Sequence, residues 1–498
     1  MMVMDGGRGT RDDFAEALSQ ADALQLQGRY LEAIAVYEKA LVLVPNSAAG
    51  HNNCGVACMA LGRLSEAAMR FQHALDAKPD YAEAHNNLGV ALKRQGEGDQ
   101  ALACYVRALE INPRYAKALL NVGTYFFERR NYSEALSWYG ESLCFEPEQV
   151  EANQNVALIL EKLGRHEEAA FHRRIAFGRQ SMFIDLSARQ ERTVLVLWGA
   201  GVGNIPIDHL LPVDTTTRIV WIIEHGDTTE PLPDYDLVFN AIGDPDVLGP
   251  VEGKLHDFVG RCQHRLFNAP TAVARTRRDL LAKLLEDAAV VVPPTRRIPR
   301  NQVAETLQQL DATAFPILLR PTSSHGGDHL HKVDVKPVEQ NMALWNAEFY
   351  YVTGYQDYRS VDGHYRKYRF IFIDRKPYPY HLAIGNDWMV HYETAGMLQD
   401  EWKRQEERDF LASPVDAIGE RAHAALERIG RALNLDYAGI DFSVLADGRV
   451  LVFEANATML VHPEDEAGVL AHKNPYVQNI LDAFNAMLTT GATPLLQR

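Results

Sequence analysis

Long apolar runs are absent from this chain of 498 residues. No stretch approaches the roughly 20 consecutive apolar residues that a membrane-spanning helix requires. The opening segment "MMVMDGGRGTRDD" also lacks the apolar core of a signal peptide. We therefore expect a cytoplasmic protein without a membrane partner.

Positive charge and cysteine are scarce as well. The 50 Lys and Arg residues against 66 Asp and Glu residues give a net charge of -16, which argues against nucleic-acid binding by bulk attraction. The five cysteines form no CxxC pair, so reduced thiols packed as small hydrophobic groups are expected. Cys54 and Cys58 can share a helix face, but no histidine lies at ligand spacing, which argues against a metal site.

What is present in the first third of the chain is a repeat with a period of 34 residues. The recurring residues are Ala33, Ala67, Ala101, Ala135 and Ala169; Pro45, Pro79, Pro113 and Pro147; Tyr37, Phe71, Tyr105 and Tyr139; and Gly28, Gly62, Gly96 and Gly164, with Arg130 as an exception. A small alanine lets paired helices approach, the aromatic residue fills the gap, the glycine ends the first helix and the proline follows the second. The pattern resembles tetratricopeptide repeats, about five units over residues 14–178, after a disordered tail over residues 1–13.

One further column of the repeat carries a functional prediction. Four asparagines occupy equivalent positions in the first helix of successive repeats, namely Asn53, Asn87, Asn121 and Asn155. In tetratricopeptide repeats this position lines the concave groove, and a similar asparagine ladder in the protein O-linked N-acetylglucosamine transferases grips a polypeptide backbone. An amide offers both a donor and an acceptor, so the resemblance implies a peptide or protein segment as partner. The alternative is that these residues cap or solvate their own helices.

After Gly178 the repeat ends and strands alternate with helices. The stretches "RTVLVLWGAG", "RIVWIIE" and "DLVFNAIGD" predict buried strands, and "ARTRRDLLAKLLEDA" predicts a helix, which together indicate a small α/β domain over residues 191–295. The stretch "GAGVGN" after the first strand lacks the full GxGxxG spacing, and no helix start or acidic partner follows convincingly. Nicotinamide binding is therefore not expected.

The stretch "YAGIDFSVLADGRVLVFEANAT" predicts a β-hairpin whose arms meet at Asp447-Gly448. If those two residues form a two-residue turn, Ala446 faces Arg449, and counting back places Asp441 opposite Glu454. Asn456 then lies on the face of Glu454. Facing carboxylates destabilise a ladder unless a positive group lies between them, and Mg²⁺ takes such oxygen ligands. The alternative is a solvated sheet face with unrelated charges.

Two cation-bearing strands precede this hairpin. "FPILLRPTSSHGGDHLHKVD" predicts a strand ending in Arg320, a loop with Gly326 and Gly327, and a second strand; such a loop can lay backbone N–H groups on phosphate oxygens. The strand "YRKYRFIFI" places Lys367 and Arg369 on one face. Cations in line repel each other unless they meet anions, which indicates that these two side chains bind phosphate. The alternative is that they form structural salt bridges.

The order of these elements is similar to the ATP-grasp family, which includes glutathione synthetase and D-alanine:D-alanine ligase. The similarity covers residue 191 to the C-terminus, so the predicted architecture is an all-α repeat solenoid, an α/β pre-ATP-grasp domain and an α+β ATP-grasp domain over residues 296–498. The chain is thus predicted to be multidomain.

The resemblance implies roles for individual residues. Asp441, Glu454 and Asn456 match the residues that hold Mg²⁺ on the nucleotide. Arg320 stands where the family has a phosphate-binding Lys, a departure that keeps the charge but changes the geometry. The remaining ATP-binding residues that the resemblance implies are Gly326, Gly327, Thr353, Tyr355, Asp357, Lys367 and Arg369, with the main chain of Thr353 and Tyr355 at adenine and Asp357 at ribose. Gly354 stands where the family usually has a Glu. Arg369 matches the phosphate-binding or intermediate-binding Arg, and with Arg320 it is a candidate catalytic residue; His381 and His391 can add donors.

The implied chemistry is carboxylate–amine ligation driven by ATP and Mg²⁺. A substrate carboxylate attacks the γ-phosphorus to form an acyl phosphate, and an amine then displaces phosphate. The repeats would present a peptide or protein to this site, with a small-molecule or amino-acid co-substrate. Three alternatives stay open: a ligase for a small metabolite, a kinase of the same fold, and a scaffold with a degenerate ATP-grasp domain. The departures at Arg320 and Gly354 leave room for the last, and the complete Asp441, Glu454 and Asn456 set opposes it.

Overall fold

The computed structural model divides the chain into two compact units, Met1–Arg179 and Gln180–Arg498. It describes residues 6–178, 180–187, 189–229, 231–322, 324, 329–334, 347–392 and 394–491. Among these residues, none of the helices combines the length and the apolar character that a membrane span requires.

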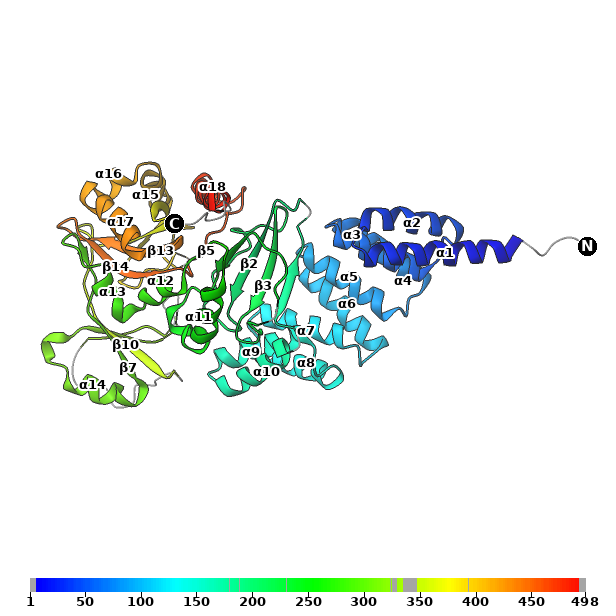
Figure 1. The fold of residues 1–498 in the computed structure, drawn as a ribbon, viewed down its shortest axis with the longest axis horizontal. Coiled ribbons are helices and arrows are strands. Elements are labelled where there is room, and N and C mark those ends of the chain that lie inside the picture. The colour runs from blue at the N-terminus through cyan, green and yellow to red at the C-terminus, as the bar shows by residue number, and fades with distance from the viewer. Residues whose placement is uncertain are drawn as a thin grey trace, which may run out of the picture. The chain divides into compact units, whose positions relative to one another are not determined.

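The first unit is built of helices that pack in consecutive pairs (Figure 1). The helices are α1 (Gly6–Leu26), α2 (Tyr30–Leu43), α3 (Ala48–Ala60), α4 (Leu64–Ala77), α5 (Ala82–Arg94), α6 (Gly98–Ile111), α7 (Ala116–Glu128), α8 (Tyr132–Phe145), α9 (Val150–Lys162) and α10 (His166–Gly178). The predicted all-α repeat solenoid is confirmed. Helix α1 begins at Gly6, so it extends into residues 1–13, which the sequence predicts to be a disordered tail because they lack apolar periodicity.

The glycines at the ends of the first helices have the predicted role. Gly28, Gly62 and Gly96 have φ angles of 74°, 72° and 89°, the left-handed region in which a helix ends without strain for glycine. Arg130, the exception in this column, adopts the same conformation with a φ of 58°. The backbone geometry of the repeat is therefore retained where the glycine is not.

The aromatic column packs against a second column of glycines that the sequence analysis did not use. A Cβ atom added to Gly55 would lie 2.7 Å from the Phe71 ring, and one added to Gly89 would lie 2.5 Å from the Tyr105 ring. Gly123 faces Tyr139 in the same way, at 2.7 Å. These glycines let the first helix of a repeat touch a buried ring on the second, which sets the spacing of the helix pair.

The buried tyrosines of this column differ in their hydrogen bonds. The Tyr37 hydroxyl donates to Asp22 at 2.6 Å, and that of Tyr139 donates to Thr124 at 3.2 Å. The Tyr105 hydroxyl is buried without a partner in the described part of the chain, and Val90 occupies the position equivalent to Thr124. An unpartnered buried hydroxyl costs free energy, while a paired one contributes it.

Replacing Tyr105 by phenylalanine should therefore leave the stability of the repeat unit unchanged or raise it by at most about 1 kcal/mol. Tyr37→Phe should instead destabilise it by about 1.5–3 kcal/mol, because the hydrogen bond to the Asp22 carboxylate is lost. Scanning calorimetry of the two variants and the wild type measures both effects. Equal losses in the two variants would show that the Tyr105 hydroxyl has a partner after all.

The second unit opens with a mainly parallel sheet in the order β1-β3-β2-β4-β5. Its strands are β1 (Met182–Asp185), β2 (Arg192–Trp198), β3 (Thr216–Ile222), β4 (Leu237–Asn240) and β5 (Leu266–Phe267), with helices η1 (Pro245–Val247), η2 (Gly249–Val251), α11 (Glu252–Arg261), α12 (Pro270–Arg275) and α13 (Arg278–Leu284). The three predicted strands are present, because their continuous apolar residues are buried on both faces. The predicted single helix over 274–288 is instead broken at Arg277, whose backbone is extended.

Two further sheets complete the unit. An antiparallel sheet in the order β7-β10-β8-β9 contains β7 (Thr295–Pro299), β8 (Ile317–Pro321), β9 (His331–Val333) and β10 (Phe349–Gly354). A sheet in the order β12-β11-β13-β14-β6 contains β6 (Val290–Val291), β11 (Tyr365–Ile373), β12 (Lys376–Gly385), β13 (Tyr437–Val444) and β14 (Val450–Asn456). The accompanying helices are η3 (Arg300–Gln302), α14 (Val303–Gln309), η4 (Ala312–Ala314), α15 (Glu401–Ala412), α16 (Pro414–Ile418), α17 (Glu420–Leu433), η5 (Ala471–Lys473) and α18 (Asn474–Gly491). The mixed α/β character of this half is confirmed.

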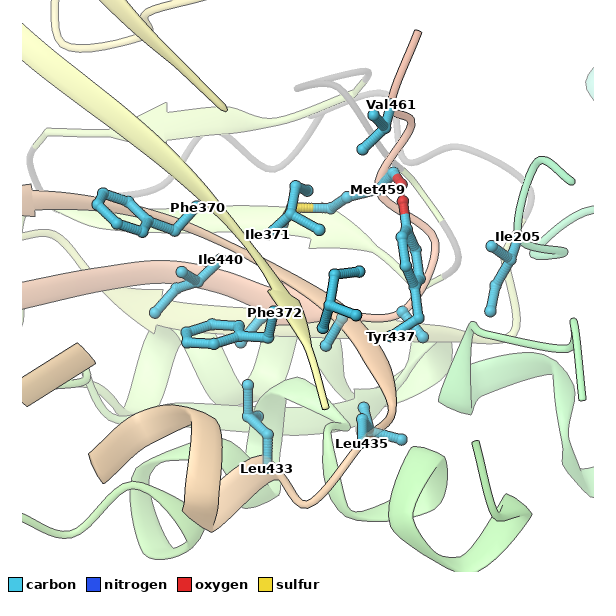
Figure 2. Close-up of a cluster of buried hydrophobic side chains, with 14 of the residues drawn as sticks. Ile205, Phe370, Ile371, Phe372, Leu433, Leu435, Tyr437, Ile440, Met459 and Val461 are labelled. Carbon is cyan, nitrogen blue, oxygen red and sulfur yellow. Dashed lines mark hydrogen bonds between the residues drawn. The ribbon is translucent and has the colours of Figure 1, made fainter. Parts of the chain in front are cut away.

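One apolar core joins the first and third sheets of this unit. Figure 2 shows part of it, with Phe370 and Phe372 of β11 beside Ile440 of β13 and the Tyr437 ring pointing to the segment of Met459. The Tyr437 hydroxyl donates to the Met459 carbonyl. The segment after β14 is thereby held against β13, which positions the residues that follow Asn456.

Candidate functional site

The β13–β14 hairpin has the predicted pairing of carboxylates but reaches it by a different route. Asp441 lies opposite Glu454, as predicted. The turn contains three residues rather than two, because the Leu445 amide donates to the Arg449 carbonyl and Gly448 adopts a φ of 78°. The predicted two-residue turn is therefore wrong.

A β-bulge restores the pairing. Phe442 pairs with Val452 while Asp441 pairs with Glu454, so Phe453 is an extra residue on β14. The turn shifts the register by one residue and the bulge shifts it back. Hairpin counting from sequence contains neither shift, and it is correct at Asp441 because the two cancel.

Four side chains form a row across four adjacent strands. His381 of β12 pairs with Arg369 of β11, Arg369 pairs with Asp441 of β13, and Asp441 pairs with Glu454 of β14. Directly paired residues of antiparallel strands share a face, so these four groups point to the same side of the sheet. We call this set the cross-sheet row.

Protein cations neutralise the facing carboxylates. The Arg369 guanidinium donates to both Asp441 oxygens, at 2.5 and 2.8 Å, and Lys367 Nζ lies 3.3 Å from the same carboxylate. Arg278, the first residue of α13, lies 2.8 Å from Glu454. Burial opposes the charge on Asp441, but the Arg369 and Lys367 cations outweigh it and hold the pKa of the carboxyl below its ordinary value. Lys367 and Arg369 therefore do form salt bridges, the alternative left open by the sequence.

The predicted metal ligands lie together. The Asn456 amide donates to Glu454, and its carbonyl oxygen accepts from the Thr458 backbone and hydroxyl, both at 2.9 Å. Within the described residues no three His, Cys, Asp or Glu side chains gather at a metal-binding distance. The set of two carboxylates and one amide supplies the hard oxygen ligands that suit Mg²⁺, although its carboxylates are bound to guanidinium groups here.

Arg320 presents a buried cation close to the Arg278–Glu454 ion pair. It lies near the end of β8, and its guanidinium donates to the Ser324 hydroxyl at 3.1 Å and to the Ser324 carbonyl. Burial, and next the neighbouring Arg278 cation, lower the pKa of Arg320 to about 10. Glu454 raises the pKa of both arginines, so the two cations share one carboxylate and the group carries one net positive charge by difference.

These groups line one cavity of about 910 Å³, within the size range of about 300–1,000 Å³ for small-molecule sites. The predicted residues on its wall are Arg320, Thr353, Tyr355, Lys367, Arg369, Asp441, Glu454 and Asn456, with His381 and His391. Asp357 is not on this wall; it is exposed, and its carboxylate accepts from the Arg359 amide, so the structure does not bring it to the site. The predicted Gly326 and Gly327 lie outside the described residues.

The cavity wall carries both charged and apolar side chains. Among the described residues on its wall, the cations are Arg278, Arg320, Lys367 and Arg369, and the carboxylates are Asp441 and Glu454. This gives an excess of two positive charges by difference. The apolar wall is made by Leu318, Val292, Pro293, Trp388, Met389, Val390, Leu451 and Phe453. A ligand that has both an anionic group and an aromatic or apolar group matches this lining.

Sequence reasoning missed Arg278 and the loop after β2. Arg278 belongs to a basic run in a segment predicted as one helix, and only the break at Arg277 turns it toward Glu454. The loop after β2 contributes Gly203 and Asn204 to the cavity wall. Asn204 closes this loop by donating to the carbonyls of Gly199 and Gly201, and residues 199–215 contain no helix, in agreement with the rejection of a dinucleotide fingerprint.

The asparagine column of the first unit links neighbouring repeats. Asn87 donates to Asn52 of the preceding repeat at 3.0 Å, and Asn121 donates to Asn86 at 2.8 Å. Asn53 donates to Asp22 at 3.0 Å, and Asn155 interacts with the Tyr139 hydroxyl. The four side chains are half-buried. Since an amide has two N–H donors and a carbonyl acceptor, Asn87 and Asn121 each keep one donor and one acceptor beyond the inter-repeat bond.

Family comparisons agree with the repeat. Residues 82–115 match the tetratricopeptide repeat family, and residues 21–62 and 57–96 match a second model described as a TPR repeat. The first unit therefore contains tetratricopeptide repeats. No curated protein matches the chain.

Solved structures similar to this chain each cover about a third of it. MamA is 23% identical over 35% of this chain and 94% of its own, with a TM-score of 0.28. YrrB, described as a TPR protein with an unusual peptide-binding site, is 24% identical over 33% of this chain and 84% of its own, with a TM-score of 0.27. PilF of Pseudomonas aeruginosa is 19% identical over 34% of this chain and 77% of its own, with a TM-score of 0.32.

Proposed function

We propose that the second unit is an ATP-dependent carboxylate–amine ligase of the ATP-grasp type and that the repeats bind the peptide or protein on which it acts. The observation that carries the proposal is the cavity described above. It collects, from β8, β10 and the residue after it, β11, β13 and β14, most of the residues that the family resemblance assigns to ATP and Mg²⁺; Asp357 is not on the wall, and Gly326 and Gly327 lie outside the described residues. These residues are far apart in the sequence, so their convergence on one wall is independent support.

The charge of the cavity favours a nucleotide. The excess of two positive charges on the described wall matches the net charge of about -2 of MgATP. The Tyr355 and Trp388 rings contact each other edge to face, with centroids 5.8 Å apart and planes at 87°, and offer an aromatic wall for the adenine ring. The lining thus suits both the phosphates and the base of one ligand.

In this proposal Arg320, Arg278 and Lys367 bind phosphate oxygens, and Arg369 lies between the nucleotide and the second substrate. Preorganised cations stabilise charge that develops on the transferred phosphoryl group without reorganising during the reaction. Bound Mg²⁺, held by Asp441, Glu454 and Asn456, would supply Lewis-acid polarisation of the phosphate oxygens. The chain needs no covalent nucleophile, since the substrate carboxylate supplies the attacking oxygen.

The proposal requires that ATP stabilise the protein only together with Mg²⁺, which thermal unfolding of the wild type measures. Analysis of the products with candidate peptides then separates the alternatives. ADP, phosphate and a new amide indicate a ligase, and ADP with a phosphorylated product indicates a kinase. Absence of any ATP-dependent stabilisation would support a scaffold in which the repeats carry the function.

For the repeats, we expect the double change Asn87→Ala and Asn121→Ala to lower retention on an array of unstructured peptides by about tenfold, because two backbone-pairing amides are lost. Asn131→Ala is the matched control. Asn131 caps α8 by accepting from the Glu134 amide at 3.4 Å, so its loss costs about 1 kcal/mol of stability without touching the column. Equal loss of retention in both would mean that the effect comes from unfolding rather than from the amides.

A further inference from the structure

His381 carries a buried nitrogen that the proposed nucleotide site does not use. The side chain is 6% exposed and lines the cavity. Its Nε2 atom is buried and has no hydrogen-bond partner among the described residues. A buried polar atom without a partner costs free energy, so a ligand that pairs with it gains that free energy on binding.

The ring is held in a fixed orientation from behind. It stacks on the Tyr392 ring with centroids 4.9 Å apart and planes at 1°. The Tyr392 hydroxyl donates to Glu407 at 2.8 Å, and Glu407 is fully buried. The same carboxylate accepts from the Leu382 amide at 3.1 Å and from His472 at 2.9 Å. A rotamer locked by stacking and by a satisfied buried carboxylate is a preorganised one.

The surroundings select the charge of the ligand. Burial, and next the cations of Arg369, Lys473 and Lys367, hold the pKa of His381 well below its ordinary value, so the ring is neutral at neutral pH. These three cations outnumber the two carboxylates that pair with them, Asp441 and Glu464, so an anion is favoured over an ammonium group here. A neutral imidazole with its proton on Nε2 donates one hydrogen bond to an anionic oxygen at this place.

The position in the cross-sheet row separates this nitrogen from the metal ligands. His381 is one strand beyond Arg369 and two strands from Asp441. With strands about 4.8 Å apart, its Cα lies roughly 10 Å along the sheet from that of Asp441. Phosphates bound at Asp441 and Glu454 would therefore leave His381 for the second substrate, with Arg369 between the two.

We propose that His381 and Arg369 form an oxyanion subsite that holds the activated carboxyl group, in which the His381 Nε2–H donates to an oxygen of the acyl phosphate. The proposal rests on the proposed ligase function for the identity of the ligand. No bond to His381 forms or breaks, so it acts as a hydrogen-bond donor and not as a nucleophile. Tyr392 and Glu407 are positioning residues, because they act through the orientation of the His381 ring.

Inorganic phosphate is the probe, because it is a tetrahedral oxyanion and a product of the proposed reaction. Phosphorus NMR of the full chain with phosphate, Mg²⁺ and ADP reads the binding of phosphate and of the nucleotide in one sample. For His381→Leu the phosphate Kd should rise at least about tenfold, and for His381→Gln, which keeps an N–H, less than about threefold. The Kd of MgADP should change less than about twofold in both.

Two results would overturn the subsite. Unchanged phosphate binding in His381→Leu would show that Nε2 meets no oxyanion, and a matching loss of MgADP would assign His381 to the nucleotide. Tyr392→Phe keeps the stack but loses the bond to Glu407; a phosphate Kd that rises by an intermediate factor supports its positioning role. A third result separates the two proposals. If the wild type does not bind MgADP but binds phosphate in a way that depends on His381, the nucleotide proposal is refuted and the oxyanion subsite is retained.

Discussion

Asp441→Asn should remove the stabilisation of the protein by ATP and Mg²⁺ and also destabilise the protein without ligand by about 3 kcal/mol. The first effect follows from the loss of a proposed metal ligand. The second follows from the contacts of the carboxylate, because Arg369 and Lys367 would remain half-buried beside a neutral amide. Thermal unfolding of variant and wild type, each with and without MgATP, measures both effects.

Asp447→Asn is the control for this change, since Asp447 lies in the exposed turn of the same hairpin. It should keep the response to MgATP and change the stability much less than Asp441→Asn does, because an exposed ion pair is screened by solvent. A full response to MgATP in Asp441→Asn would exclude Asp441 as a metal ligand.

The pH dependence of stability gives a further prediction. Because the pKa of Asp441 is lower in the folded protein, the stabilisation by its carboxylate is present above the ordinary pKa of 3.8. It is lost as the pH falls through the pKa of the folded protein. The stability of Asp441→Asn should therefore fall less steeply on acidification.

Gly89→Ala should destabilise the repeat unit by about 1–3 kcal/mol, although alanine is the better helix former. The new methyl group would lie 2.5 Å from the Tyr105 ring and 3.0 Å from the Ala101 carbonyl, so helices α5 and α6 must move apart. Gly140→Ala is the matched control, because Gly140 is an exposed helix residue of the same unit with nothing within 4 Å of an added methyl group. That change should stabilise by about 0.5–1 kcal/mol.

Hydrogen exchange of α5 and α6 gives the local readout for the glycine variants. We expect faster exchange of α5 and α6 in Gly89→Ala. In Gly140→Ala, the exchange of α8 should be unchanged or slower. Combining Gly89→Ala with Tyr105→Leu, which removes the ring, should recover part of the loss relative to the sum of the single changes. Strict additivity of the two changes would show that the methyl group and the ring do not clash.

The sequence predicted what depends on residues close together in the chain. The repeat follows from columns at a fixed interval, and strands β2, β8 and β11 follow from their apolar patterns. Lys367 and Arg369 share a face because side chains alternate along a strand, which needs no knowledge of the fold. These features are local, so they were predictable.

What the sequence did not predict depends on contacts between distant segments. The ion pair of Arg278 with Glu454 joins residues 176 positions apart, by difference of their numbers, and requires the break at Arg277. Asp357 was assigned by its place after the linker strand, but its carboxylate turns to the Arg359 amide of its own loop. The glycine column was visible in the sequence and was not used, because a glycine inside a helix is read as a weakness until the facing ring is known.

The compensating irregularities of the β13–β14 hairpin affect how the protein tolerates length changes. Three residue pairs lie between the three-residue turn and the extra Phe453. They are Phe442–Val452, Ser443–Leu451 and Val444–Val450. These short pairs separate the turn from Asp441, so an insertion among Ala446, Asp447 and Gly448 can lengthen the loop without moving the charged residues. The hairpin tip is thus a position at which a reporter sequence can be inserted while the cavity keeps its arrangement.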